Sequence, residues 1–134
     1  MVLVDANILI DLFTNDPDWA DWSEQALADA ASHGEVLINP VIYAEVSIAF
    51  KNARRLDKAL EDLEIGRSVL PYAAGFLAGK AFMEYRKRGG LKRSPLPDFY
   101  IGAHALHDGL KLLTRDPTRY RTYFPAVEVI SPRS

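Results

Sequence analysis

The chain has 134 residues and a formal net charge of only -2, which predicts one domain over residues 1–134 and excludes a strongly basic or acidic protein. It contains no cysteine, which argues against a disulfide framework or a thiolate metal site and favours a reducing, cytoplasmic location. Acids interrupt the apolar residues near the N-terminus and no apolar run approaches membrane-spanning length, so we expect neither a signal peptide nor a membrane span.

The charges are distributed unevenly along the chain. The first fifty residues hold nine acids and no Lys or Arg, and the remainder, with 16 basic and nine acidic residues, carries +7. This asymmetry is compatible with a locally basic face for RNA or DNA. It is also compatible with charges scattered over solvated faces. Taken alone, the charge asymmetry favours this second interpretation.

The chain begins with a predicted buried strand. Val2–Val4 is a short apolar run with β-branched ends, typical of a strand buried on both faces, and Asp5 follows it directly. We expect a short helix over residues 7–13. Asp16 and the proline after it predict the cap of a second helix, which ends at Gly34.

A second strand and helix follow. Val36–Ile38 is another buried run, and Asn39 with the next proline opens a helix over residues 41–49. Glu45 lies inside the apolar stripe of this helix. Burying an ionised carboxylate is costly unless it is paired or binds a metal, although a salt bridge on the helix face or a drifting stripe are open alternatives.

The second half continues the alternation of helices and strands. We expect, in order, an amphipathic helix over 55–65, an edge strand at 69–70, a long helix from about 74 that ends at the glycines 89 and 90, a loop over 90–97, a helix opened by Asp98, a strand over 111–114, a turn at 115–117 into a short helix, and a last strand over 127–130.

This alternation predicts the α/β class. Strands and helices that alternate without hairpin signals indicate βαβ crossovers, and therefore a three-layer α/β/α domain with a central parallel sheet. Right-handed connections and a reversal of strand order would place the first strand beside the strand at 112–113. Asp5 and Asp116 follow these two strands, so we expect both at the edge where ligands bind.

Four acids are predicted to converge at this edge: Asp5, Glu45, Asp98 and Asp116. Helix capping is an alternative for each of them except Glu45. Acids gathered closely repel one another, and one or two Mg²⁺ or Mn²⁺ ions, which prefer oxygen ligands, would relieve that repulsion. Such a site suits hydrolysis at phosphorus.

Two further groups of residues carry side chains that can bind a metal ion or a phosphate. His104 and His107 share one predicted helix, but no third ligand is evident, so we expect them to be structural or on the surface. The basic residues Arg86, Lys87, Arg88, Lys92, Arg93, Arg115 and Arg119 are candidates to hold phosphates that flank the site. Such contacts leave the choice between tRNA, rRNA and mRNA open, and a solvated basic face is the alternative.

Taken together, these motifs resemble the PIN-domain family, and more narrowly the VapC-like ribonuclease toxins of type II toxin-antitoxin modules. The resemblance is carried by Val4-Asp5-Ala6-Asn7, by Glu45 after Asn39-Pro40, by Leu96-Pro97-Asp98-Phe99-Tyr100-Ile101-Gly102-Ala103-His104-Ala105, and by Leu113-Thr114-Arg115-Asp116-Pro117 through Tyr123-Phe124-Pro125 and Ile130-Ser131-Pro132.

The resemblance implies a PIN-like fold and an Mg²⁺- or Mn²⁺-dependent endoribonuclease, usually a homodimer, held inactive by a cognate antitoxin. It implies that the four acids named above occupy the family's acidic positions, with Asp5 and Asp98 the principal metal ligands. Asn7 and Thr114 match polar positions of the family that would orient a carboxylate or a water.

Other classes of protein are weighed against this one. A flavodoxin-like phosphoacceptor module would want an acidic pair after the first strand and a lysine after a late one, which residues 5–7 and 114–116 do not supply. A haloacid-dehalogenase-like phosphatase would want an acid where Asn7 stands. A non-catalytic PIN-like RNA-binding protein would keep the fold, and the retained acids argue against it.

Overall fold

The computed structural model describes residues 1–93 and 96–132. Within these residues, five parallel strands form one sheet in the order β3-β2-β1-β4-β5. The strands are β1 (Val2–Val4), β2 (Val36–Ile38), β3 (Gly66–Arg67), β4 (Lys111–Leu113) and β5 (Val129–Ile130). The predicted α/β class and the parallel sheet are confirmed.

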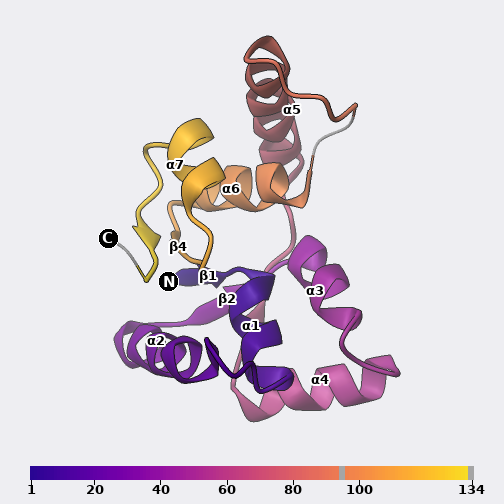
Figure 1. Ribbon diagram of the computed structural model, residues 1–134, viewed down its shortest axis with the longest axis vertical. Helices are drawn as coiled ribbons and strands as arrows, with labels where there is room; N and C mark the ends of the chain where they lie inside the picture. The colour runs from indigo at the N-terminus through magenta and orange to yellow at the C-terminus, as the bar shows by residue number, and fades with distance from the viewer. Residues whose placement is uncertain (94–95, 133–134) are drawn as a thin grey trace.

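Seven helices accompany the sheet in the described part of the chain. They are α1 (Ala6–Phe13), α2 (Ala20–His33), α3 (Pro40–Ser47), α4 (Ala53–Asp62), α5 (Tyr72–Lys87), α6 (Pro97–Asp108) and α7 (Thr118–Tyr123). In Figure 1, α1, α2 and α4 lie below the sheet, and α6 and α7 lie above it, which gives the expected three layers. No helix among the described residues has both the length and the apolar character needed to cross a membrane.

The central strand β1 explains where a site can form. It pairs with β2 on one side, in the register Val2 to Val36, and with β4 on the other, in the register Leu3 to Leu112. Strand order therefore reverses beside β1, as predicted. The backbone N–H of Asp5 donates to the carbonyl of Leu113 at 2.9 Å, so the carboxyl ends of β1 and β4 adjoin at the position where ligands bind in such sheets.

The layer of α6 is packed closely against α7. Phe99 and Ile101 of α6 are fully buried, and Phe124 directly after α7 is almost so. Gly102 permits this packing, because a Cβ there would lie 2.4 Å from the ring of Phe124. This contact holds α6 against the end of α7, and Tyr120 of α7 lies within hydrogen-bond distance of both Asp5 and Asp98.

The edge strand predicted at residues 69–70 is wrong, because the strand lies three residues earlier. Val69 is 82% exposed, whereas Gly66 and Arg67 pair with Leu37 and Ile38 of β2. A Cβ on Gly66 would lie 2.9 Å from the side chain of Leu37, so close packing favours glycine in the strand. The apolar pair at 69–70 misled the prediction, since glycine and arginine carry little strand propensity.

Several predicted boundaries are also wrong by a few residues. The helix expected from Asp16 begins at Ala20, because Asp16 Oδ1 instead accepts from the backbone N–H groups of Asp18 at 2.9 Å and Trp19 at 3.0 Å, which caps a turn. The helix expected over 55–65 is α4, the helix of Asp98 begins one residue earlier, and the last strand covers only its final two residues. Residues 94 and 95 of the predicted loop lie outside the described residues.

Candidate active site

Asp5 is buried at the end of β1, with 6% of its surface exposed. Its Oδ1 accepts from the backbone N–H of Ala6 at 2.8 Å, so the capping alternative for this residue is correct. Its Oδ2 accepts from the hydroxyls of Thr114 at 2.8 Å and Tyr120 at 2.9 Å. Capping therefore uses one carboxylate oxygen, and the other lies among groups from β4 and α7.

Asp98 lies in the first turn of α6 and meets Asp5 through Tyr120. The Tyr120 hydroxyl, which is fully buried, lies 3.3 Å from Asp98 Oδ1 as well as 2.9 Å from Asp5 Oδ2. A hydroxyl has one hydrogen, so it donates to only one of these carboxylates at a time. The N-cap of α6 is Leu96, without a side-chain cap among the described residues, so the capping alternative for Asp98 is wrong.

Glu45 projects from α3 into the same region. Its Oε1 is buried and has no hydrogen-bond partner among the described residues. Burial, followed by the charges of Asp5 and Asp98, raises the pKa of Glu45 to about 7. Its electrostatic neighbours are therefore acids, and within the described chain no basic partner pairs with it as the salt-bridge alternative required.

Burial and neighbouring acids both disfavour the charged forms of Asp5, Glu45 and Asp98. Burial raises the pKa of Asp5 to about 6, although the hydrogen bond from Thr114 opposes it, and the charge of Asp98 adds to the rise. Burial also raises the pKa of Asp98, against the opposing charge of Arg119, whose Nη1 lies 3.4 Å from Asp98 Oδ2. The region thus holds more negative charge than its own basic residues balance.

Thr114 and Asn7 join the end of β4 to α1. The Thr114 hydroxyl donates to Asp5 and accepts from Asn7 Nδ2 at 3.2 Å and from the backbone N–H of Asp116 at 3.1 Å. Asn7 Oδ1 accepts from the backbone N–H of Arg115 at 3.0 Å. These bonds fix the turn over residues 114–116 against α1.

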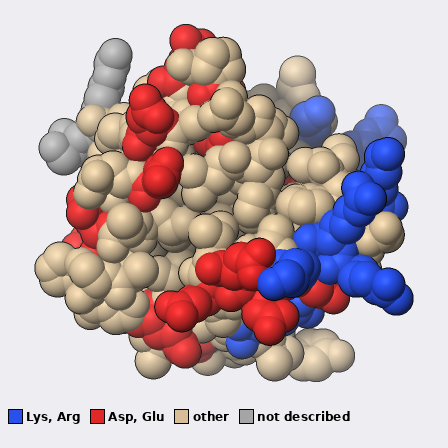
Figure 2. Space-filling view, turned by 90° about the horizontal axis from the view of Figure 1, so that it is seen from below, with Lys and Arg blue, Asp and Glu red and all other residues tan. Residues whose placement is uncertain are grey.

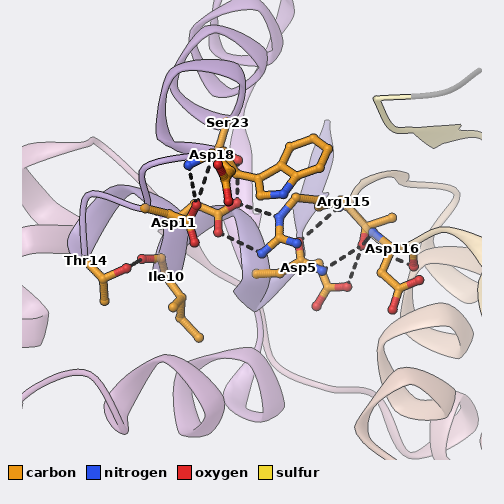
Figure 3. A network of polar contacts seen from close by, with 12 residues as sticks. Asp5, Ile10, Asp11, Thr14, Asp18, Ser23, Arg115 and Asp116 are labelled. Atoms are coloured by element: carbon orange, nitrogen blue, oxygen red, sulfur yellow. Dashed lines mark hydrogen bonds and ion pairs between the residues drawn. The ribbon is translucent and has the colours of Figure 1, made fainter.

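Asp116 is exposed and stands at the rim of the site. In Figure 3, its side chain and that of Asp5 point the same way from the ends of the adjoining strands. The N-cap of α7 is Pro117, without a side-chain cap among the described residues, so capping does not account for Asp116. Its charge acts on Asp98, which links it electrostatically to the buried acids.

Sequence reasoning missed the role of Asp11, which holds the same turn through a long-range ion pair (Figure 3). Both of its oxygens accept from Arg115, from Nε and Nη2 at 2.8 Å each, and Ser23 donates to it at 2.8 Å. The Arg115 guanidinium carbon also lies 5.1 Å from the centroid of the Trp19 ring. The sequence did hold a signal for this role: Asp11 is an acid in an apolar helix, four residues after Asn7 and therefore on the same side of the helix.

The predicted structural part of the histidines agrees with their contacts. His104 is buried, with Nδ1 at 3.0 Å from Asn39 Nδ2 and Nε2 at 3.0 Å from Asp108. His107 is exposed and lies 2.7 Å from Asp108. His104 thus joins α6 to Asn39 at the end of β2, whereas His107 contacts only Asp108 of its own helix.

The acids suit a divalent cation by their chemistry, although not by their present spacing. Among the described residues, no three acidic, histidine or cysteine side chains lie close enough together to hold an ion as they are placed. The chemistry of the donors nevertheless fits: Glu45 presents a buried oxygen without a partner, and Asp5 and Asp98 both lie within hydrogen-bond distance of one hydroxyl. Carboxylate oxygens are the ligands that Mg²⁺ and Mn²⁺ take in proteins.

The predicted phosphate-binding residues fall into two groups. Five are exposed at the end of α5 and after it: Arg86, Lys87, Arg88, Lys92 and Arg93. Arg115 and Arg119 are partly buried beside the acids and pair with Asp11 and Asp98. Figure 2 shows one face, on which most of the visible basic side chains gather at one side and the acids lie elsewhere, so the two signs of charge are not evenly mixed on this face.

The fold and the site define a class of protein: a three-layer α/β domain whose acids gather over the strand reversal of a parallel sheet. The PIN domain family model matches residues 2–125, and the chain belongs to the PIN-domain family. Membership disfavours the phosphoacceptor alternative. Comparison with curated proteins gives no significant match.

Solved structures share this fold over nearly the whole chain. A chain of a toxin-antitoxin complex from Klebsiella pneumoniae is 26% identical, with a TM-score of 0.71 over 100% of this chain and 99% of that one. Chains of VapBC2 from Rickettsia felis, bound to a promoter DNA fragment, and of VapBC-1 from nontypeable Haemophilus influenzae are each 20% identical, with TM-scores of 0.72 over 98% of both chains. At 20% identity these last two show the fold alone.

Proposed function

We propose that the protein is a divalent-metal-dependent endoribonuclease, the toxin of a type II toxin-antitoxin module. The observation that carries the proposal is the convergence of Asp5, Glu45 and Asp98 from three elements on one region, where a buried oxygen of Glu45 has no partner among the described residues and Asp5 and Asp98 share the Tyr120 hydroxyl. Burial raises the pKa of each of these acids, and neighbouring acids add to the rise. Membership of the PIN-domain family supports the proposal. So does the similarity to a chain of a toxin-antitoxin complex from Klebsiella pneumoniae.

Asp5, Glu45, Asp98 and Asp116 are the residues that would hold one or two Mg²⁺ or Mn²⁺ ions. When bound, the cation would bring positive charge to the scissile phosphate and lower the pKa of the attacking water. The donors around Asp5 keep its carboxylate in place for that purpose. Thr114 and Tyr120 orient Asp5, and Asn7 orients Thr114 in turn.

The basic residues would bind the RNA chain on either side of the cleaved bond. Basic residues exposed at the end of α5 and after it suit contacts with phosphates: Arg86, Lys87, Arg88, Lys92 and Arg93. Of these, Arg88 pairs with Glu84 at 3.2 Å and lies 5.3 Å from the centroid of the Tyr123 ring. Arg115 would contact phosphate only at the expense of its bidentate pair with Asp11, so its main part is to position the turn that carries Asp116.

We further propose that the protein pairs with a cognate antitoxin, forms a homodimer and acts in the cytoplasm. The similar chain from Klebsiella pneumoniae comes from a toxin-antitoxin complex. Its similarity over the full length supports an equivalent partner here. Co-purification of the toxin with the product of a short neighbouring reading frame would test this part.

The catalytic part is tested with purified variants. Asp5→Asn and Asp98→Asn should abolish Mg²⁺- or Mn²⁺-dependent RNA cleavage, because each removes a ligand charge with little change in volume. Asp29→Asn, an exposed acid on α2, is the matched control and should cleave normally. Full cleavage by both site variants, with folding verified by circular dichroism, would refute the assignment.

A chelator experiment separates the nuclease from a non-catalytic RNA-binding protein. Excess chelator should stop cleavage and added Mn²⁺ should restore it. Sequencing of the RNA ends made by the wild type, with Asp5→Asn as the control, would then identify the substrate. RNA binding without any metal-dependent cleavage would favour the binding protein instead.

A further inference from the structure

A hollow of about 330 Å³ lies directly beside the acids. Its walls include Asp98 and Asp116, Tyr85 near the end of α5, and Arg119, Thr122 and Tyr123 of α7. We call it the α7 hollow. Because it shares two walls with the candidate active site, a group bound there would be a close neighbour of the phosphate that the acids receive.

Arg119 is held against aromatic rings on one wall of the α7 hollow. Its guanidinium carbon lies 5.6 Å from the ring centroid of Tyr85 and 5.7 Å from that of Phe99. The ion pair with Asp98 fixes the same group, and 35% of the Arg119 side chain stays exposed. A guanidinium fixed in this way can stack on a nucleobase, as arginine planes do in RNA recognition.

The tyrosines of the hollow are also fixed before any ligand arrives. The rings of Tyr85 and Tyr123 meet edge to face at 6.2 Å, and each lies 5.5 Å from the buried ring of Phe99. Both tyrosines are partly exposed. Rings that are already ordered lose little conformational freedom when a base contacts them, which favours binding.

Polar atoms in the α7 hollow suit the edge of a base. The Thr122 hydroxyl donates to the backbone carbonyl of Thr118 at 2.8 Å, so its oxygen remains able to accept a hydrogen bond. The exposed carboxylate of Asp116 is a second acceptor. Acceptors beside stacking surfaces match the amino and imino donors of a base edge.

We propose that the α7 hollow receives an unpaired nucleobase of the RNA, next to the scissile phosphate. The inference rests on the proposed nuclease function and adds to it a binding position for one base, with Arg119 as the stacking surface. A base inside a duplex is stacked on both faces and paired along its edge, so it cannot enter a hollow of this kind.

The experiment compares binding of a short, fluorescein-labelled single-stranded RNA with binding of the same chain built from abasic ribose phosphates. Both carry the same phosphates, so their ratio of affinities measures the contribution of the bases. Anisotropy is measured with Mg²⁺ in the full chain carrying Asp5→Asn, which lies outside the hollow and should not cleave. The RNA with bases should bind at least about fivefold tighter.

Arg119→Lys distinguishes stacking from a phosphate contact, because lysine keeps the charge and lacks the plane. We expect it to bring the ratio of affinities close to unity while affinity for the abasic chain scarcely changes. Tyr123→Leu should lower the ratio as well. Arg121→Lys is the matched control on the same helix: Arg121 donates to Ser131, does not line the hollow, and should leave the ratio unchanged.

Three results would overturn the proposal. They are equal affinities for the two probes in the parent protein, a ratio that neither Arg119→Lys nor Tyr123→Leu lowers, and duplex RNA that binds as tightly as the single strand. Metal-dependent cleavage by the wild type is measured in parallel. Cleavage without base-dependent binding would refute the nucleobase site and leave the nuclease function standing. Base-dependent binding without cleavage would refute the nuclease function and leave the nucleobase site standing.

Discussion

The ion pair between Asp11 and Arg115 permits a quantitative test of how the turn of Asp116 is held. Asp11→Asn keeps the shape of the side chain and removes its charge. Asp11 is 2% exposed and Arg115 29% exposed, and their two hydrogen bonds are 2.8 Å long. Breaking a buried pair by removing one partner costs about 3–5 kcal/mol. Because water can still reach part of Arg115, we expect a loss of about 3 kcal/mol, at the lower end of that range.

Urea denaturation followed by circular dichroism gives the free energy of unfolding for this comparison. Asp29→Asn is the control. The exposed carboxylate of Asp29 accepts a hydrogen bond from Gln25 Nε2 at 2.9 Å, and its replacement should change the free energy of unfolding by no more than about 0.5 kcal/mol. A double variant with Arg115→Gln should lose much less than the two single variants combined, because the stranded charge is gone. A loss below about 1 kcal/mol for Asp11→Asn would refute this account of the turn.

Three further predictions concern the carboxyls and the packing beside them. In metal-free buffer the folded protein keeps protons on Asp5 up to pH about 6 and on Glu45 up to about 7, against 3.8 and 4.5 for ordinary carboxyls. The free energy of unfolding that these two groups supply should therefore fall as pH rises from about 4 to about 7, and Glu45→Gln should flatten that profile in thermal unfolding. Tyr120→Phe removes a hydrogen-bond donor to Asp5 and should lower the free energy of unfolding, measured by urea denaturation, by about 1 kcal/mol. Tyr123→Phe, at a partly exposed position, is the control and should lower it little. Equal losses for the two variants would contradict a stabilising hydrogen bond from Tyr120. Gly102→Ala should cost about 1–3 kcal/mol, because its Cβ would lie 2.4 Å from a buried ring, and an unchanged melting temperature would show that the packing adjusts.

The sequence predicted the parts of the site that follow from local patterns. Short buried apolar runs identify β1, β2 and β4, and Asp5 directly follows the first of them. Glu45 could also be singled out from the sequence, because it is an acid inside the apolar stripe of the predicted helix. The reversal of strand order beside β1 was also predictable, because the handedness of crossovers leaves few arrangements.

Only the tertiary structure decided the contacts between distant segments. Tyr120 belongs to a short helix whose sequence gives no sign that its hydroxyl reaches Asp5 and Asp98, 115 and 22 residues away. The pair of Asp11 and Arg115 spans 104 residues, and β3 formed at a glycine because of packing against β2. Periodicity reports which side of an element is buried, whereas the partner that buries it depends on how all the elements pack together. The sequence thus determined which acids lie at the sheet edge, and the packing of α6 and α7 on the sheet decided what surrounds them.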